Sequence, residues 1–143
     1  MFDISHLHPM VVHFPIALLV VGFLADVLSL LLHRKEPCLS KIGFYLMVLG
    51  TLSIIAAYIT GDLFTKDMVG AAGDLKNRHE LLARITMLVM LVASAARIYH
   101  VSTKKEKPVI KWLTFSLFAL GTIMVMITGF LGGNLVYGHM IGL

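Results

Sequence analysis

The sequence contains very little charge for its length. Only 14% of its 143 residues are Asp, Glu, Lys or Arg, whereas a soluble globular domain has roughly 25%. Hydrophobic residues make up 58% of the chain, and the mean hydropathy is +0.88. Such a chain lacks the polar groups that a water-facing surface needs. The composition therefore predicts an integral membrane protein, and the length predicts one domain spanning residues 1–143.

Two other absences narrow the interpretation. No lysine or arginine precedes Arg34, so the first segment lacks the basic start of a secretory signal peptide, and we expect the first apolar run to stay in the mature protein. The only cysteine is Cys38, which excludes an internal disulfide. Neither HExxH nor CxxC occurs, so no compact metal-ligand signature is present.

Four apolar runs are long enough to cross a bilayer. They cover residues 9–32, 42–63, 81–99 and 109–131, and each is close to the roughly 20 residues that a hydrocarbon core of about 30 Å requires of a helix. The alternating pattern of a transmembrane β-strand is absent from them. Short polar segments join the runs, which predicts an all-α fold, a four-helix up-down bundle integral to the membrane.

The basic residues are concentrated in two of the connecting segments. The net charge is +4, and it gathers in one group between the first two runs and in another around the last connection: Arg34, Lys35 and Lys41, then Arg97, Lys104, Lys105, Lys107 and Lys111. By the positive-inside rule both segments face the cytoplasm, so both termini face the outer side. The basic excess is thus a signal of topology, and we expect no nucleic-acid partner.

Five of the seven histidines fall on the predicted outer side. His6, His8 and His13 lie at the start of the first run, His79 at the start of the third, and His139 after the fourth. A helix that only anchors a protein does not need metal-ligating side chains at its end. Ionisable groups are also costly to bury in or near the membrane. These histidines are therefore candidate ligands, with chance clustering at the interface as the alternative.

Two short segments of the chain recur later in the sequence, and these recurrences, which we call echoes, indicate two helical-hairpin repeats. The segment ITG at 59–61 reappears at 127–129, and LGTL at 49–52 has an echo, LGTI, at 120–123. The two echoes differ in spacing by three residues, so this alignment needs a gap of nearly one helical turn. Parallel repeats are related by an axis along the membrane normal. Under that symmetry we expect His13 and His79 to face one another across the bundle.

The histidines of the first run are spaced so that they point in different directions. His8 and His13 are five residues apart, which places them about 140° apart around a helix. We therefore expect them to serve different partners, or only one of them to be functional. Pro9 between them suits the first turn of a helix, where its missing N–H has no intrahelical partner.

Two ion pairs are expected from depth and spacing. Asp26 and Arg97 lie at a similar depth near the cytoplasmic side, which favours a structural ion pair over a proton relay. Glu80 and Arg84 are four residues apart in the third run, which suits a local ion pair. Alternatively, Arg84 can bind an acidic group of a ligand in the mouth of the bundle.

Two motifs resemble those of a known family. HPMVVHFPIA at 8–17 and GGNLVYGH at 132–139 resemble the signatures of a large bacterial family of predicted inner-membrane proteins of unknown function. The resemblance covers essentially the whole chain, although Met140 replaces the glycine that usually ends the second motif. It implies a location in the bacterial inner (cytoplasmic) membrane with periplasmic termini. Related domains occur fused to or beside Rieske-type and cytochrome c modules, which favours a role in electron transfer over a stand-alone enzyme.

The first functional hypothesis is a b-type cytochrome that binds haem through the outer-face histidines. His13 and His79 are the first choice of axial pair, and His8 and His139 can ligate a second haem or a separate metal. Basic residues near them can pair with the haem propionates: Lys76, Arg78 and Arg84. The protein would then pass electrons between the membrane quinone pool and a redox protein on the outer face, alone or as a homo-oligomer.

Two alternatives stay open. A zinc or copper ion can be bound by three or four neutral imidazoles, drawn from His8, His13, His79 and His139 with Asp62 as a further ligand. In the other alternative the protein is a structural membrane subunit without a cofactor, and the histidines are merely interfacial. A nucleophilic enzyme is disfavoured, because no serine or cysteine lies at the histidine face in a suggestive context.

Overall fold

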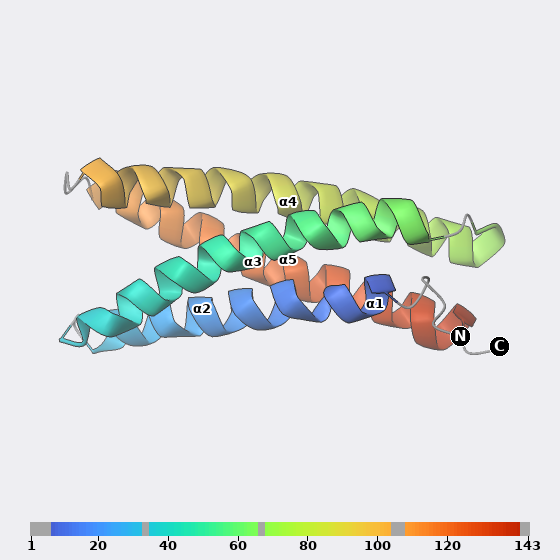
Figure 1. Cartoon of the computed structure of the whole chain (residues 1–143), viewed down its shortest axis with the longest axis horizontal. Helices are drawn as coiled ribbons and strands as arrows, with labels where there is room; N and C mark the ends of the chain where they lie inside the picture. The colour runs from blue at the N-terminus through green and yellow to red at the C-terminus, as the bar shows by residue number, and fades with distance from the viewer. Residues whose placement is uncertain (1–6, 33–34, 66–67, 104–107, 141–143) are drawn as a thin grey trace.

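The computed structural model describes residues 7–32, 35–65, 68–103 and 108–140, and almost all of them are helical. The elements are α1 (Leu7–Val11), α2 (His13–Leu31), α3 (Pro37–Phe64), α4 (Gly70–Thr103), α5 (Pro108–Leu135) and a π-helical turn η2 (Val136–Met140). The four long helices run along one another through the length of the molecule (Figure 1). The predicted all-α four-helix bundle is confirmed.

The four predicted spans match helices that are long and apolar enough to cross a membrane, the first to within one residue at its end. These are Leu7–Leu31, Pro37–Leu63, Gly70–Thr103 and Pro108–Gly138. The helix α4 begins at Gly70, well before residue 81, where the predicted apolar run begins. The apolar run starts later than the helix because the first turns of α4 are polar. At 34 residues the helix is about 50 Å long, more than a hydrocarbon core of about 30 Å needs. We therefore expect the polar start of α4 to project beyond the hydrocarbon.

Prolines set several helix boundaries. Pro37 and Pro108 begin α3 and α5, a position where the missing N–H has no intrahelical partner. Pro15 has the opposite effect on the first helix. Its ring clashes with the carbonyl of the residue four positions earlier, Val11, and Val11 is the last residue of α1. The first span is therefore divided at Val12 into a short α1 and a long α2.

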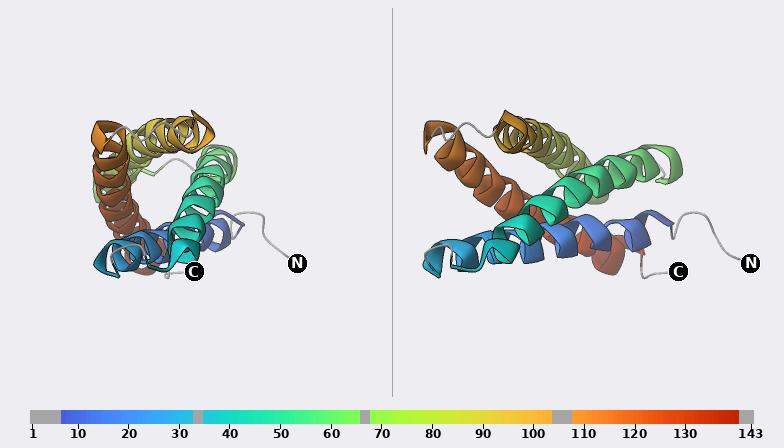
Figure 2. Two further views of the ribbon diagram at one scale, coloured as in Figure 1. Left: turned by 90° about the vertical axis from the view of Figure 1, so that its left-hand side faces the viewer. Right: turned by 60° about the vertical axis from the view of Figure 1, so that its left-hand side comes forward.

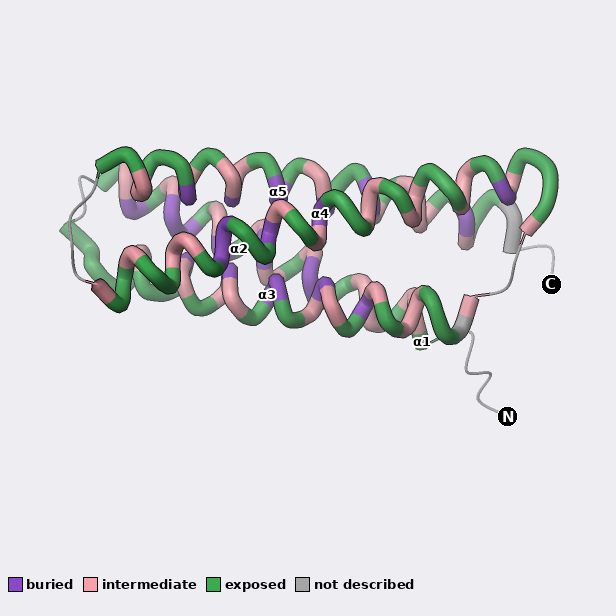
Figure 3. The backbone as a smooth tube through the Cα atoms, turned by 90° about the horizontal axis from the view of Figure 1, so that it is seen from above, coloured by how far each residue is buried: buried purple, intermediate pink, exposed green. Residues whose placement is uncertain are grey.

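The helices form two hairpins, α2–α3 and α4–α5, arranged as a four-sided ring. Within the ring α2 also packs against α5, and α3 against α4. Figure 2 shows this ring end-on, and Figure 3 shows the buried positions concentrated along its interior. The start of α1, the end of α3 and η2 share one end, which we call the histidine end because it carries His8 and His79. We call the opposite end, with Asp26 and Arg97, the arginine end.

The two hairpins are repeats in register, with a constant separation of 71 residues, the separation of Asp26 and Arg97. The core residues make this plain. Leu19, Met47 and Ile54 are 0%, 0% and 6% exposed, and their counterparts 71 residues later have the same values. Those counterparts are Met90, Phe118 and Val125. Equal burial at equivalent positions indicates that the two hairpins pack in the same way.

The close contact between the two helices of each hairpin is repeated as well. A side chain at Gly50 of α3 would overlap Leu19 of α2, and one at the equivalent Gly121 of α5 would overlap Met90 of α4. Glycine at these two positions lets the helix backbones approach closely. The echoes LGTL and LGTI contain these glycines, so that part of the predicted repeat is in register with the fold.

The other predicted echo is out of register. The structure aligns the hairpins without a gap, so Gly61 corresponds to Gly132, and the ITG segment at 127–129 lies nearly one turn away from the true counterpart of 59–61. Because both segments are apolar helix with a small residue, their similarity does not reflect equivalent positions. The predicted gap of nearly one helical turn between the two repeats is therefore wrong.

Charged and polar groups link the two hairpins in the interior. The guanidinium of Arg97 donates to both carboxylate oxygens of Asp26 and to the backbone carbonyl of Ser40. Nearer the middle of the bundle, the hydroxyls of Thr51 and Ser94 lie 2.8 Å apart. The predicted ion pair between Asp26 and Arg97 is confirmed. It joins α2 of one hairpin to α4 of the other.

Candidate functional site

Two histidines meet at the histidine end, at equivalent positions of the two repeats. His8 comes from α1 and His79 from α4, and their separation is that of the repeat. Their ring centroids are 6.4 Å apart, with the ring planes nearly perpendicular at 80°. The internal symmetry therefore brings together two side chains of the same chemistry, both of which can ligate a metal through a ring nitrogen.

The ring of His8 is held by α3. Its Nδ1 lies 3.2 Å from the hydroxyl oxygen of Thr60, and that hydroxyl donates its own proton to the carbonyl of Ala57 at 3.0 Å. The hydroxyl is therefore the acceptor, and Nδ1 of His8 is the donor. The ring lies against Gly61, where a Cβ atom would be only 2.9 Å from Cε1 of His8.

The ring of His79 is held by α5 in a corresponding way. Its Nδ1 lies 3.0 Å from the backbone carbonyl oxygen of Thr128. A carbonyl oxygen only accepts, so Nδ1 carries the proton. Gly132, the counterpart of Gly61, lies against this ring, and a Cβ atom there would be 3.1 Å from Cε1 of His79. Each histidine thus rests on a glycine of its own hairpin.

These hydrogen bonds fix which nitrogen of each ring is available. With Nδ1 donating in both rings, the neutral imidazoles of His8 and His79 keep their lone pairs on Nε2. Within the described part of the chain, neither Nε2 has a hydrogen-bond partner. Metal-ligating histidines characteristically donate their second ring nitrogen to a carbonyl or hydroxyl, which fixes tautomer and orientation. In both rings, therefore, Nδ1 is hydrogen-bonded to the protein and the lone pair of Nε2 is available to bind a metal.

The structure places His13 away from this pair. His13 is exposed, and its Nδ1 donates to the carbonyl of Pro9 at 2.7 Å. The expectation that His8 and His13 diverge is confirmed, whereas the expectation that His13 faces His79 is wrong. The reason is the register of the repeat, because the counterpart of His79 is His8 and the counterpart of His13 is Arg84. Both members of the second pair are exposed.

The remaining predicted residues do not join the pair. Arg78 and Arg84 are exposed on α4, and Asp62 is exposed at the end of α3. Glu80 forms its ion pair with Lys76 at 3.3 Å, so the expected pairing of Glu80 with Arg84 is wrong. Lys76 lies one turn before Glu80 on the same face, on the side where long helical side chains lean.

Some predicted ligands lie outside what the structure describes. His6 and the side chain of His139 fall there, so their relation to the pair is not placed. Among the residues that the structure does describe, no group of three or more His, Cys, Asp or Glu side chains can hold a metal ion. The described donor set at the histidine end is thus two imidazoles.

Sequence reasoning missed the residues that support the two rings. Thr60, Gly61, Thr128 and Gly132 come from α3 and α5, far along the chain from the histidines that they position. A sequence signal existed in the separation of 71 residues, which relates His8 to His79 and Gly61 to Gly132 without a gap. The motif HPMVVHFPIA thus contributes one inward histidine and one exposed histidine.

Fold and site together define a class: an integral membrane four-helix bundle of two repeated hairpins, with a histidine pair at one end. Within that class the chain belongs to a family described as "Predicted membrane protein (DUF2231)", whose match covers residues 5–143. The resemblance drawn from the two motifs is thereby confirmed. Comparison with curated proteins and with solved structures gave no match.

Proposed function

We propose that this protein is a b-type cytochrome-like membrane protein in which His8 and His79 are the axial ligands of one haem. The observation that carries the proposal is the pair itself: two imidazoles at equivalent positions, each with Nδ1 donating to the protein and Nε2 available. His79 keeps the role expected from the sequence, and His8 replaces His13 as its partner.

The number of protein donors favours haem over a bare metal ion. Structural zinc sites take four ligands and catalytic zinc sites three from the protein, whereas the described residues offer two imidazoles. A haem iron needs only axial ligands, because the porphyrin supplies the other four nitrogens. Zinc or copper is the second candidate, and it requires a further ligand outside the described side chains.

The spacing of the rings suits a shared metal. Imidazole–metal bonds are about 2 Å long, so two imidazoles on opposite sides of one iron have ring centres roughly 6 Å apart. The observed separation is 6.4 Å. The absence of a side chain at Gly61 and Gly132 leaves room for the rings of His8 and His79 against α3 and α5. The recess beside Gly61, about 200 Å³, is small for a porphyrin, and neither histidine lines it.

The location of the pair suggests how electrons would pass. The histidine end lies at one face of the membrane, and the positive-inside rule places it on the outer face of a bacterial inner membrane. A haem there is near the surface, in reach of an outer-face redox protein and of quinone at the membrane interface. Arg78 adjoins His79 in the chain and is exposed, so it is the residue we assign to a haem propionate.

The test is a reduced-minus-oxidised absorption spectrum of the detergent-purified protein from haem-replete cells, together with metal analysis. We expect an α band and a shifted Soret band that are lost in His8→Ala and in His79→Ala. His13→Ala is the matched control, since His13 belongs to the same motif but is exposed. Loss of the bands in His13→Ala alone would refute the assignment, and a colourless protein with stoichiometric zinc or copper would favour the second candidate.

A further inference from the structure

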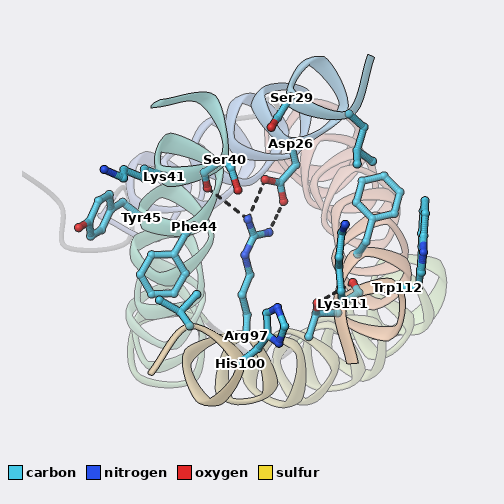
Figure 4. Close-up of a pocket in the computed structure, with 14 residues that line it drawn as sticks. Asp26, Ser29, Ser40, Lys41, Phe44, Tyr45, Arg97, His100, Lys111 and Trp112 are labelled. Atoms are coloured by element: carbon cyan, nitrogen blue, oxygen red, sulfur yellow. Dashed lines mark hydrogen bonds and ion pairs between the residues drawn. The ribbon is translucent and has the colours of Figure 1, made fainter. Parts of the chain in front are cut away.

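A cavity of about 550 Å³ opens at the arginine end of the bundle. Figure 4 shows it between helices, with Asp26 and Ser29 on α2 facing Arg97 and His100 on α4. His100 lies 21 residues after His79 on one helix, which separates the cavity from the histidine pair by about 30 Å. A ligand in this cavity would therefore bind independently of the proposed haem.

The acidic group in this cavity is already neutralised. The carboxylate of Asp26 is bound by Arg97 through both oxygens, so this pair contributes little net charge. Lys111 also lines the cavity, whereas the ammonium group of Lys41 points away from it (Figure 4). Lys111 has no acidic partner within the described ranges, so its ammonium group gives the cavity an excess of positive charge.

Two buried polar groups in the cavity lack hydrogen-bond partners. The residue Ser29 is 3% exposed, and both its hydroxyl oxygen and the Nδ1 of His100 are buried without a partner in the described structure. Buried polar groups are nearly always hydrogen-bonded in native proteins, because an unpaired one loses its hydration. These two residues are counterparts in the repeat. A bound ligand would supply the hydrogen-bond partners that these two groups lack.

The walls of the cavity are apolar and aromatic. Leu30, Phe44, Phe115 and Trp112 line it together with the polar groups. A small inorganic anion makes no use of such walls, whereas an amphiphile with an anionic head does. Lysine ammonium, hydroxyl and imidazole groups can all donate hydrogen bonds to phosphate oxygens.

We propose that the cavity at the arginine end binds the phosphate headgroup of an anionic phospholipid, held by Lys111, Ser29 and His100. The position supports a lipid source, since the cavity lies where the helices end and basic side chains reach headgroup level. Acyl chains would follow the apolar walls outward between the helices. A free phosphate anion shares the same headgroup chemistry, and the test distinguishes the two.

The test measures ligand-dependent thermal stability of the full-length protein in neutral detergent. The probes are phosphatidylglycerol, phosphatidylcholine and inorganic phosphate, each titrated alone. The variants are Lys111→Gln and Ser29→Ala. Lys35→Gln is the matched control, because Lys35 is exposed at the same end and does not line the cavity.

We expect phosphatidylglycerol to raise the midpoint of unfolding of the natural protein and of Lys35→Gln. In Lys111→Gln the apparent affinity should fall about tenfold or more, the loss expected when a charge-assisted hydrogen bond is removed. Ser29→Ala should separate folding from binding. Removing a hydroxyl without a partner leaves the ligand-free protein as stable as before or more so, while its response to phosphatidylglycerol weakens.

Four results would count against the proposal. Equal stabilisation by phosphatidylcholine would overturn the requirement for an anionic head. An equal loss in Lys35→Gln and Lys111→Gln would show general charge attraction, and an unchanged response in both cavity variants would show that the cavity is not the site. Stabilisation by inorganic phosphate alone, lost in Lys111→Gln, would keep the phosphate site and replace the lipid by a soluble anion.

Discussion

Asp26 and Arg97 occupy the same position in two repeated hairpins and bind one another across the interface between them. In a symmetric pair of identical hairpins this position would bring like charges together. Two hairpins joined in one chain can differ, so one carries the acid and the other the base. At His8 and His79 the repeats have instead kept the same residue, which suits a ligand that is approached equally from both sides.

The ion pair between Asp26 and Arg97 should be among the most sensitive points of the fold. Asp26→Ala leaves the guanidinium of Arg97, whose side chain is 12% exposed, buried without its partner. Breaking a buried pair in this way costs about 3–5 kcal/mol. We expect that loss in the free energy of unfolding, measured by denaturant titration in detergent.

The ion pair between Lys76 and Glu80 on α4 provides the comparison for this prediction, because its acidic partner is exposed. Glu80→Ala removes one partner of Lys76 at a position where the Glu80 side chain is 41% exposed, and Lys76 has a further interaction. Exposed pairs contribute about 0–1 kcal/mol, so Glu80→Ala should be nearly neutral. Equal effects of Asp26→Ala and Glu80→Ala would contradict the structural role of the interior pair.

Gly61 and Gly132 should control the histidine pair without controlling the fold. Gly61→Ala places a methyl group 2.9 Å from Cε1 of His8, so the ring must move. We expect haem occupancy in Gly61→Ala to fall by about tenfold or more at limiting haem, with helicity unchanged by circular dichroism. Gly133→Ala is the control, because no atom lies within 4 Å of a Cβ there. An equal loss of haem occupancy in Gly133→Ala would show that contact with the His8 ring is not the cause.

Alanine at the equivalent glycines Gly50 and Gly121 should have unequal effects. The new methyl group meets the branched end of Leu19 in one hairpin and the sulfur of Met90 in the other. Methionine adapts more easily than leucine, and overpacking a core costs about 1–3 kcal/mol. We expect Gly50→Ala to lower the midpoint of thermal unfolding more than Gly121→Ala does.

A double variant tests the cause of that difference. Adding Leu19→Ala to Gly50→Ala removes the atoms that the methyl group meets, so the combined loss should be smaller than the sum of the two single losses. Strict additivity would show that the contact between Leu19 and Gly50 is not responsible.

The single cysteine offers a direct test of orientation. Cys38 is exposed at the start of α3, at the arginine end, which the basic residues predict to face the cytoplasm. A membrane-impermeant maleimide should therefore label inverted vesicles and not intact spheroplasts. In Asp62→Cys made on a Cys38→Ser background, the exposed cysteine at the histidine end should show the opposite pattern. Labelling of Cys38 in spheroplasts would reverse the proposed topology.

The sequence by itself determined the class of protein and its helices. Hydropathy and length are local properties, and a bilayer leaves an apolar run of about 20 residues little choice but a helix, so the four spans could be found one at a time. The pair between Asp26 and Arg97 was also predictable, because each residue is an isolated charge at a known depth in its own helix.

Tertiary structure decided which histidine faces inward. His8 and His13 belong to one motif, and nothing local distinguishes them. The choice depends on Thr60 and Gly61 of α3, which lie more than fifty residues from His8 in the chain, and on a repeat whose register the ITG echo concealed. The cavity likewise needed the fold, because Ser29 and His100 are ordinary interfacial residues until packing buries both without a partner. Ligand sites in a bundle are made by contacts between helices, and such contacts depend on register and rotation that no single helix specifies.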